Sequence, residues 1–381
     1  MKIAIVIPDN RDELRRYSDP APFFGAPTAL FEGLADIQEC EIHVVSCTQK
    51  PLRSPEKLAG NIYFHSVLVP KWGWMRGAYV GCVRALSRKL REIKPELVHG
   101  QGTERYSALA AVFSGFPNVL TIHGNMRLVA KVNRAKPFSF AWLAARLETF
   151  TLPRSDGIVC ISTYTQHNVA GLARKTWVVP NAVDGSFFDL VLKPAELRQI
   201  LCVAHISVRK NQVQLIRALD PLAAKEKFEL VFYGGANRKD PYVEDFFALL
   251  KDRPWCRYAG FADRSGLKAA LASSTASVLP SLEDNCPMSV LEAMAAGVPV
   301  AAAKVGGVPD LVTPGVDGLL FDPEQLDSIR SAVSEILTDQ PRAAQLARMG
   351  KETALRRFRP NIIARRHLEI YHEVLGRRPK V

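Results

Sequence analysis

Residues 278–322 read VLPSLEDNCPMSVLEAMAAGVPVAAAKVGGVPDLVTPGVDGLLFD, and the fold can be worked out from this stretch. A helix is predicted over Met288–Ala296, because Pro287 suits the first helical position, where a missing N–H costs nothing. Gly297 suits the left-handed residue that closes a helix. An apolar strand and a polar loop precede the helix, and a second strand, Val298–Ala303, follows it. Strand, helix and strand in close succession predict a βαβ unit.

The start of this helix is a candidate ligand site. The N–H groups of Met288, Ser289 and Val290 would point outward with partial positive charge, which favours phosphate. Asp284 and Glu292 flank the site. Carboxylates repel phosphate, so they would accept hydrogen bonds from hydroxyls, and a ligand with phosphate between hydroxyl-bearing ends is a nucleotide sugar. The alternative is that Glu292 is a solvated helix residue and Asp284 a turn former.

The stretch resembles the donor-binding signature of retaining glycosyltransferases with the two-domain GT-B architecture, of the glycosyltransferase family 4 or "glycosyl transferases group 1" type. That signature is an acidic residue, seven intervening residues, Glu, and then Ala-Met-Ala-x-Gly-x-Pro-Val; here AMAAGVPV follows Glu292. The first acid falls on Asp284, where the family usually has Glu, and Glu283 lies one place further out. Which of the two acids meets the donor sugar stays open.

Length and composition fit a soluble protein of two or three domains. The chain has 381 residues, of which 48% are hydrophobic and 23% charged. No apolar run approaches the length of a membrane span, and the N-terminal apolar run over residues 3–7 is too short for a signal-peptide core. Seven scattered Cys without a CxxC pair indicate reduced, mostly buried thiols and a cytoplasmic protein.

The resemblance implies an α/β fold with two Rossmann-like domains facing a central cleft. We expect an acceptor-side domain over 1–185 and a nucleotide-sugar domain over 186–361, with a C-terminal helix, 362–381, packing back on the first. Strands are predicted at 3–7, Glu41–Cys47, Tyr63–Val69, Leu97–His99, Asn118–Ile122, Ser155–Ser162, Trp177–Asp184, Ile200–Ala204, Glu229–Gly235, Trp255–Asp263 and Ala276–Leu279.

Two further places in the first domain are candidates for the site. In the family, a Gly-rich turn opens the first helix and lies against the donor phosphate, and Gly25 occupies that place here. His123, in TIHG, stands at the carboxyl end of a strand, where ligands of open α/β sheets collect. The resemblance places His123 near the transferred sugar, whereas a core histidine is the usual alternative. His99 is a weaker candidate of the same kind.

In the second domain, HISVRKNQ at 205–212 carries candidate cations. Lys210 matches the Lys-Asn pair of the family, whereas His205 stands where Arg is common, so that Arg209 would have to supply the second cation. A cation facing a pyrophosphate stabilises the leaving group; the alternative is exposed loop charges. The implied donor-binding residues are Gly25, Arg209, Lys210, Gly234, Phe261, Glu283, Asp284, Asn285, Pro287, Met288, Ser289, Val290 and Glu292.

The resemblance implies metal-independent transfer with retention, in which the nucleotide-diphosphate sugar, UDP- or GDP-linked, is a co-substrate and no cofactor takes part. Double displacement would need a carboxylate nucleophile, and no residue is an obvious candidate. The resemblance suggests front-face attack, in which the diphosphate itself accepts the acceptor's proton, and it implies Lys210, Asp284, Glu292 and His123 as the catalytic set. The alternatives are a nucleotide-sugar 2-epimerase of the same architecture and a non-catalytic sugar-nucleotide or glycan-binding subunit.

The net charge of +12 lies mostly in the first half, since residues 1–185 hold 23 Lys and Arg against 15 Asp and Glu. Within it, the predicted helix 75–94 has one acid among six cations, and Trp72, Trp74 and Tyr79 cluster at its start. Basic residues beside interfacial aromatics suit an anionic membrane surface, although a solvated basic helix with its aromatics in the core is the alternative. No nucleic-acid-binding motif accompanies the charge.

We therefore predict a peripheral enzyme on the inner face of the cytoplasmic membrane, acting on a glycan or lipid-linked acceptor in polysaccharide, lipopolysaccharide or glycolipid assembly. A second basic cluster has three cations followed by three aromatic rings: Lys131, Arg134, Lys136, Phe138, Phe140 and Trp142. It could cover an acceptor or form a charged surface helix.

Overall fold

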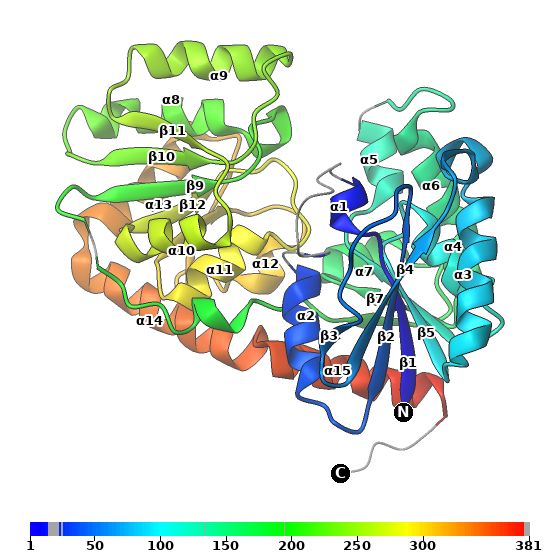
Figure 1. The fold of residues 1–381 in the computed structure, drawn as a ribbon. Coiled ribbons are helices and arrows are strands. Elements are labelled where there is room, and N and C mark those ends of the chain that lie inside the picture. Colours follow the sequence, from blue (N-terminus) through cyan, green and yellow to red (C-terminus); the bar gives the residue numbers. More distant parts are fainter. Residues whose placement is uncertain (14–22, 24–25, 133, 194, 377–381) are drawn as a thin grey trace. The chain divides into compact units, whose positions relative to one another are not determined.

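The computed structural model describes residues 1–13, 23, 26–132, 134–193 and 195–376, and it divides into two compact units. Unit 1 comprises Met1–Ala182 and Pro360–Val381, and unit 2 comprises Val183–Arg359. Each unit has its own sheet with helices on both faces (Figure 1). The sequence placed the first boundary at residue 185 and the start of the returning helix at 362; the structure places them at 183 and 360.

The sheet of unit 1 has eight strands in the order β3-β4-β2-β1-β5-β6-β7-β8. All neighbours run parallel except β3, which pairs antiparallel with β4. The strands are β1 (Lys2–Val6), β2 (Glu41–Thr48), β3 (Lys57–Ala59), β4 (Ile62–Leu68), β5 (Leu97–Gln101), β6 (Asn118–Ile122), β7 (Gly157–Cys160) and β8 (Thr176–Val178). Their near-continuous burial is typical of parallel strands covered on both faces.

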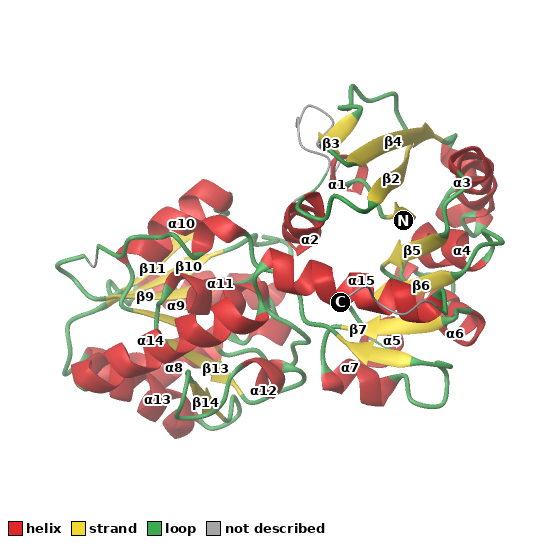
Figure 2. Ribbon diagram, turned by 90° about the horizontal axis from the view of Figure 1, so that it is seen from below, coloured by secondary structure: helices red, strands yellow, loops and turns green. Residues whose placement is uncertain are grey.

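Alternate side chains of β1 serve two separate cores. Ile3 and Ile5 pack with α2 and α15, whereas Ala4 and Val6 pack with α3, α4 and α6. Figure 2 shows α3, α4 and α6 following one another along one side of the sheet. The helices are α1 (Asn10–Glu13), α2 (Ala26–Ala35), α3 (Val80–Ile93), α4 (Tyr106–Val112), α5 (Met126–Val132), α6 (Phe140–Thr151), α7 (Thr163–Asn168) and α15 (Pro360–Val374).

The last helix, α15, belongs to unit 1 and packs closely on α2. A Cβ at Gly33 would lie 2.0 Å from Pro360 O, so only glycine permits this approach. Tyr371 O–H and His99 Nδ1 lie 2.7 Å apart, and Trp177 Nε1 donates to Glu373 at 2.8 Å. These contacts attach α15 to β5 and β8 by specific hydrogen bonds as well as apolar packing.

The sheet of unit 2 has six parallel strands in the order β11-β10-β9-β12-β13-β14. The strand order reverses between β9 and β12, and in open α/β sheets ligands bind outside the carboxyl ends of such strands. The elements are β9 (Gln199–Val203), α8 (Gln212–Ala223), β10 (Glu229–Tyr233), α9 (Pro241–Lys251), β11 (Cys256–Gly260), α10 (Arg264–Ser273), β12 (Ala276–Leu279), α11 (Met288–Ala296), β13 (Val300–Ala303), α12 (Val308–Leu311), β14 (Leu319–Phe321), α13 (Leu326–Thr338) and α14 (Gln340–Arg357).

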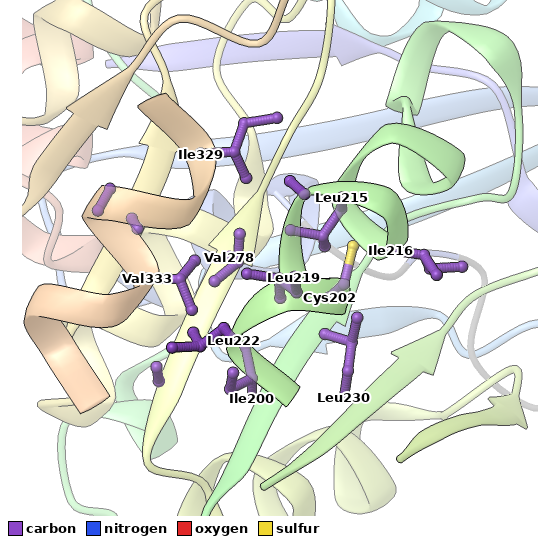
Figure 3. Packing of buried hydrophobic residues seen from close by; sticks show 14 of the residues in the cluster. Ile200, Cys202, Leu215, Ile216, Leu219, Leu222, Leu230, Val278, Ile329 and Val333 are labelled. Carbon is purple, nitrogen blue, oxygen red and sulfur yellow. The ribbon is translucent and has the colours of Figure 1, made fainter. Parts of the chain in front are cut away.

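The core of unit 2 lies between the central strands and the helices α8 and α13 (Figure 3). Leu215 and Leu219 of α8 are fully buried, and so are Ile329 and Val333 of α13. The four-residue spacing places each pair on one face of its helix. This packing fixes β9 and β12, and therefore the loops at their carboxyl ends.

The basic segment 75–94 differs from the single helix that the sequence predicted. Ala78 and Tyr79 have left-handed φ angles of 47° and 63°, which separate a short 3-10 turn from α3. Trp72 is 78% exposed, but Trp74 and Tyr79 are buried and pack edge-on against Tyr106. The interpretation that the three rings lie at the surface is therefore wrong for Trp74 and Tyr79, which lie in the core.

The sequence predicted reduced and mostly buried cysteines. All seven Cys are free and buried. Within the described parts of the chain, none of the helices combines the length and apolar character needed to cross a membrane.

Candidate functional site

A cluster of charged side chains lies where the strand order of unit 2 reverses. The chain leaves β9 through a 3-10 turn, Val208–Lys210, and leaves β12 through the polar loop that begins at Ser281. A backbone hydrogen bond of 2.8 Å from Leu282 N to Arg209 O joins these two loops. Parallel neighbouring strands bring their carboxyl ends to one edge, so residues more than seventy positions apart meet here.

Lys210 and Asp284 form the central ion pair of the cluster. Lys210 Nζ donates to Asp284 Oδ2, and the two side chains are only 12% and 10% exposed. Ser281 Oγ donates to the same carboxylate oxygen at 3.1 Å, and Asn285 N donates to Oδ1 at 3.2 Å. The pair is thus fixed in place and largely shielded from solvent, which strengthens its electrostatic interaction.

Arg209 and Glu283 form a more exposed pair beside the first. Arg209 Nη1 lies 3.2 Å from Glu283 Oε2, and both side chains are about half exposed. The same nitrogen lies 4.0 Å from Asp284 Oδ1. Both acids are therefore paired with a cation, and Glu283 is the more accessible of the two.

The loop after β13 contacts the backbone of Asp284. Gly307 N donates to Asp284 O at 3.0 Å, and a Cβ on Gly306, which has a φ of +52°, would lie 1.9 Å from the same oxygen. Gly306 is therefore required both for its backbone conformation and for this close approach.

The helix α11 spans Met288–Ala296, as the sequence predicted, but the role of Pro287 differs. Pro287 has an extended ψ of 116° and is the cap rather than the first helical residue. Its carbonyl accepts from Val290 N at 3.1 Å, so of the three predicted N–H donors those of Met288 and Ser289 are the candidates that point to a ligand. Gly297 closes the helix with a φ of 79°, as predicted.

Glu292 lies one turn into α11 and is partly buried. Burial raises the pKa of its carboxyl to about 8; Arg264 opposes this shift and Asp184 adds to it. Arg264 Nη1 and Asp184 Oδ2 are themselves an ion pair, so the cation beside Glu292 is already neutralised. The carboxyl oxygens of Glu292 can accept hydrogen bonds from hydroxyl groups, and this interaction favours the ionised carboxylate.

Gly234 and Phe261 follow the strands β10 and β11 at the same edge. Gly234 has a φ of 148°, and a Cβ there would lie 2.0 Å from Ala204 O. Phe261 is 64% exposed and lines an open groove of about 730 Å³ together with Tyr233, Arg257 and residues of α10. The groove has the size of a small-molecule site.

His123 belongs to unit 1, at the carboxyl end of β6. Its Nε2 lies 2.7 Å from Gln101 Oε1, and the Gln101 amide reaches His99 Nε2 at 3.3 Å. His99 stacks on His367 of α15. Burial lowers the pKa of His123 and of His367 to about 4, so both are neutral near pH 7.

Gln101, His123 and His367 border a small, mostly apolar cavity, which Thr121 and Asn181 also line. His123 therefore belongs to a buried neutral network at the ligand edge of the sheet, so the core and the functional interpretation both have support. His99 is fully buried and bonded to Thr121 and Tyr371, so it is a core histidine.

The structure brings together Arg209, Lys210, Glu283 and Asp284, and places Glu292 on the adjoining helix. Gly25 lies outside the described residues. The sequence did not predict several neighbours of these residues. The glycine pair 306–307 after a strand was the available signal for Gly306. The other unpredicted neighbours are Ser281, Asp184, Arg264 and Gln101.

Two family models match the chain: "Glycosyl transferases group 1" over residues 187–353 and "Glycosyltransferase Family 4" over residues 28–187. The chain is 26% identical to 2-deoxystreptamine glucosyltransferase of Streptomyces kanamyceticus over 92% of its own length and 94% of that protein. It is 29% identical to a GDP-mannose-dependent alpha-(1-6)-phosphatidylinositol monomannoside mannosyltransferase of Mycobacterium tuberculosis, over 55% of this chain and 60% of that one.

A glycosyltransferase from Methanocaldococcus jannaschii matches at 29% identity, but the match spans only 47% of the length of either protein. Among solved structures, sucrose-phosphate synthase from Thermosynechococcus elongatus superposes with a TM-score of 0.78 at 18% identity, covering 99% of both chains. This likeness extends through both units and shows the fold.

Proposed function

Because the chain belongs to the group 1 and family 4 glycosyltransferases, which have the GT-B architecture of two Rossmann-like domains, we propose that it transfers a sugar from a nucleotide-diphosphate sugar to an acceptor hydroxyl with retention. The observation that carries the proposal is the Lys210–Asp284 pair at the strand-order reversal, beside the start of α11. The chain thus combines a cation, helix N–H groups and carboxyls where such a donor would bind.

Each part of this cluster has a role in the proposed reaction. Lys210 leaves Asp284 and binds the diphosphate, whose charge grows as the sugar departs, and the N-terminus of α11 assists it. Asp284, released from the pair, orients sugar hydroxyls, and Glu283 is the alternative for this role. Glu292 accepts the ribose hydroxyls. The family resemblance assigns His123 to the transferred sugar, and the diphosphate itself takes the acceptor proton in a front-face attack.

The names of the relatives support a nucleotide-sugar donor but do not agree on a single sugar or base. One is a glucosyltransferase and another is GDP-mannose-dependent. We therefore propose a UDP- or GDP-linked hexose. A thermal-shift screen of the purified protein against nucleoside diphosphates and their sugars would identify the base and the sugar.

The test of the activity is release of nucleoside diphosphate on addition of acceptor, followed by mass spectrometry of the product. Interconversion of the donor without acceptor would indicate a 2-epimerase. Binding without any turnover would indicate a non-catalytic subunit. Either result would contradict the proposal.

Nucleotide binding should become tighter as the pH rises from about 7 to about 9. The pKa of Glu292 is raised to about 8 in the free protein; ribose hydroxyls that donate to the carboxylate favour its ionised form, so binding releases a proton in this range. Glu292→Gln should weaken nucleoside diphosphate binding and abolish the pH dependence in calorimetry. Asp284→Asn should bind the nucleotide nearly normally, because its proposed partner is the sugar; equal losses in both variants would show that the roles are wrongly divided.

Transfer should continue in excess EDTA. Among the described side chains, no three His, Cys, Asp or Glu gather as the ligands of a metal ion would, and the proposed mechanism assigns the leaving charge to Lys210 and α11. The measurement is turnover with and without chelator. Loss of turnover that Mg²⁺ or Mn²⁺ restores would contradict the metal-independent mechanism.

We also propose that the acceptor is lipid-linked and that unit 1 docks on an anionic bilayer through α3 and the turn before it. Arg84, Arg88 and Arg91 are exposed along one side of α3. The preceding residues expose apolar side chains, which are Leu68, Trp72, Met75 and Val80. Cations beside exposed apolar residues fit the headgroup region of a membrane.

The protein should co-sediment with vesicles that contain anionic lipid and should dissociate as salt screens the charges. Replacing Arg84, Arg88 and Arg91 by Glu should weaken binding by at least 10²-fold, because each cation near an anionic bilayer contributes about 1 kcal/mol. Indifference of the wild-type protein to anionic vesicles at low salt would refute the membrane proposal and leave the transferase assignment intact.

A further inference from the structure

A second group of exposed and half-buried aromatic and arginine side chains lies on α6 and just beyond its two ends. Here they are called the α6 ladder, which consists of Phe138, Phe140, Trp142, Arg146, Phe150 and Arg154. The phenylalanines are 87%, 38% and 39% exposed in that order. Large apolar side chains that gather on a surface mark an interaction site more often than chance exposure does.

From Trp142 onward, the ladder alternates rings and cations along one side of the helix. Trp142, Arg146 and Phe150 follow at intervals of four residues, which places them on one face. The Arg146 guanidinium lies 4.9 Å from the Trp142 ring centre, and that of Arg154 lies 3.8 Å from the Phe150 ring centre. Each arginine thus covers an aromatic face while its remaining N–H groups can reach anions.

The surroundings of the ladder are strongly basic. Residues 104–156 contain seven Lys and Arg and three acids, Glu104, Glu148 and Asp156. Glu148 is fully buried, and its carboxylate accepts from Thr103 Oγ1 at 2.7 Å and from Met126 N at 3.1 Å. Asp156 is the exposed acid of the three, so cations are in excess at this surface.

The position of α6 relates the ladder to the basic helix α3. Both pack on the same side of the sheet of unit 1, where the buried helix α4 lies between them (Figure 2). Both also run from the carboxyl edge of the parallel strands toward the amino edge, as helices that connect such strands do. One flat surface can therefore contact α3 and α6 together.

We propose that the α6 ladder is a second bilayer-contacting surface, which binds anionic phospholipid headgroups and lays α6 along the membrane. This inference rests on the membrane docking proposed for α3. If α3 and α6 both contact the bilayer, the two contacts set the orientation of unit 1 on the membrane as well as its affinity for the membrane. The carboxyl edge of the sheet, which carries His123, would then lie beside the headgroups, where the polar part of a lipid-linked acceptor is located.

The ring–cation pairs favour a bilayer over other anionic partners. Single-stranded nucleic acid binds by stacking bases on open aromatic faces, but the faces of Trp142 and Phe150 each have an arginine over them. A protein interface usually has an apolar centre surrounded by a polar rim, whereas rings and cations alternate in the ladder from Trp142 to Arg154. Arginine beside an aromatic ring fits the boundary between acyl chains and phosphates.

The test is co-sedimentation with vesicles of equimolar phosphatidylcholine and phosphatidylglycerol, using the full chain. Arg146→Glu combined with Arg154→Glu should weaken binding by about 30-fold, the equivalent of two headgroup-bound cations. Phe138→Ala with Phe140→Ala should weaken binding several-fold with little change in its salt dependence. Activity on a soluble short-chain acceptor should stay at the wild-type level in both variants.

The matched control is Arg365→Glu with Arg366→Glu, which makes the same change in net charge on exposed positions of α15, on the opposite side of the sheet. This control should bind within about threefold of wild type. If the ladder variants bind vesicles as the control does while the α3 variant does not bind, the ladder proposal is wrong and the α3 docking stands. A ladder variant that binds normally but loses a dimer in sedimentation would assign the ladder to contact between copies and would likewise overturn the proposal.

Discussion

Lys210→Ala should lower the turnover number by about 10²–10³-fold, the usual effect of removing one preorganised charge that stabilises a transition state. Lys210 is held against Asp284 at the start of the proposed diphosphate site, with only 12% of its side chain exposed. A cation in such surroundings acts more strongly than one in bulk water. Steady-state kinetics at saturating donor measures the effect directly.

The same substitution leaves the Asp284 carboxylate buried without its cation, which should also cost about 3 kcal/mol of stability. The double variant Lys210→Ala with Asp284→Asn removes the unpaired charge and should recover most of this stability without recovering turnover. Lys251→Ala, at an exposed position on α9, serves as the control. A Lys210→Ala enzyme within threefold of the wild-type rate would remove this residue from the mechanism.

Gly306→Ala should lower both the stability and the donor affinity of the protein. The new Cβ would overlap the Asp284 carbonyl oxygen, at 1.9 Å, in a backbone conformation that disfavours any side chain. Overpacking of this kind costs about 1–3 kcal/mol, and the left-handed backbone adds about 1–2 kcal/mol. Because the loop can relieve the overlap only by moving Asp284, donor affinity should fall at least tenfold in calorimetry.

Gly260→Ala is the control that separates these two costs. Gly260 also has a positive φ, of 80°, but a Cβ there meets nothing within 4 Å. It should therefore lose only the smaller backbone contribution and keep its donor affinity. Equal melting temperatures and affinities for the two variants would show that the contact between Gly306 and Asp284 has no consequence.

The sequence was most informative where short-range chemistry determines structure. The helix 288–296, its left-handed closing glycine and the strand before it follow from local residue preferences, and the structure has them at the predicted positions. The family signature located Asp284 and Glu292 because their spacing is short and fixed. The fold class follows from the same signature, and the structural neighbours agree with it.

Contacts between distant residues could not be predicted in this way. The Lys210–Asp284 pair joins residues 74 positions apart, and the His99–Tyr371 contact joins residues 272 apart, so neither leaves a local pattern. The sequence left open whether Trp74 and Tyr79 lie at the surface or in the core, because the left-handed φ angles of Ala78 and Tyr79 occur at residues that are not glycine. Burial of this kind depends on the tertiary position of the turn.

The chain passes from unit 1 to unit 2 after residue 182 and returns after residue 359, and this route constrains biosynthesis. A ribosome finishes all of unit 2 before it makes α15, so unit 2 can fold while unit 1 still lacks its last helix. Until then, the nascent chain exposes the apolar side of α2 and the partners of Tyr371 around His99. Chaperone demand during synthesis should therefore fall on the half of the protein that is translated first, because that half is the last to be completed.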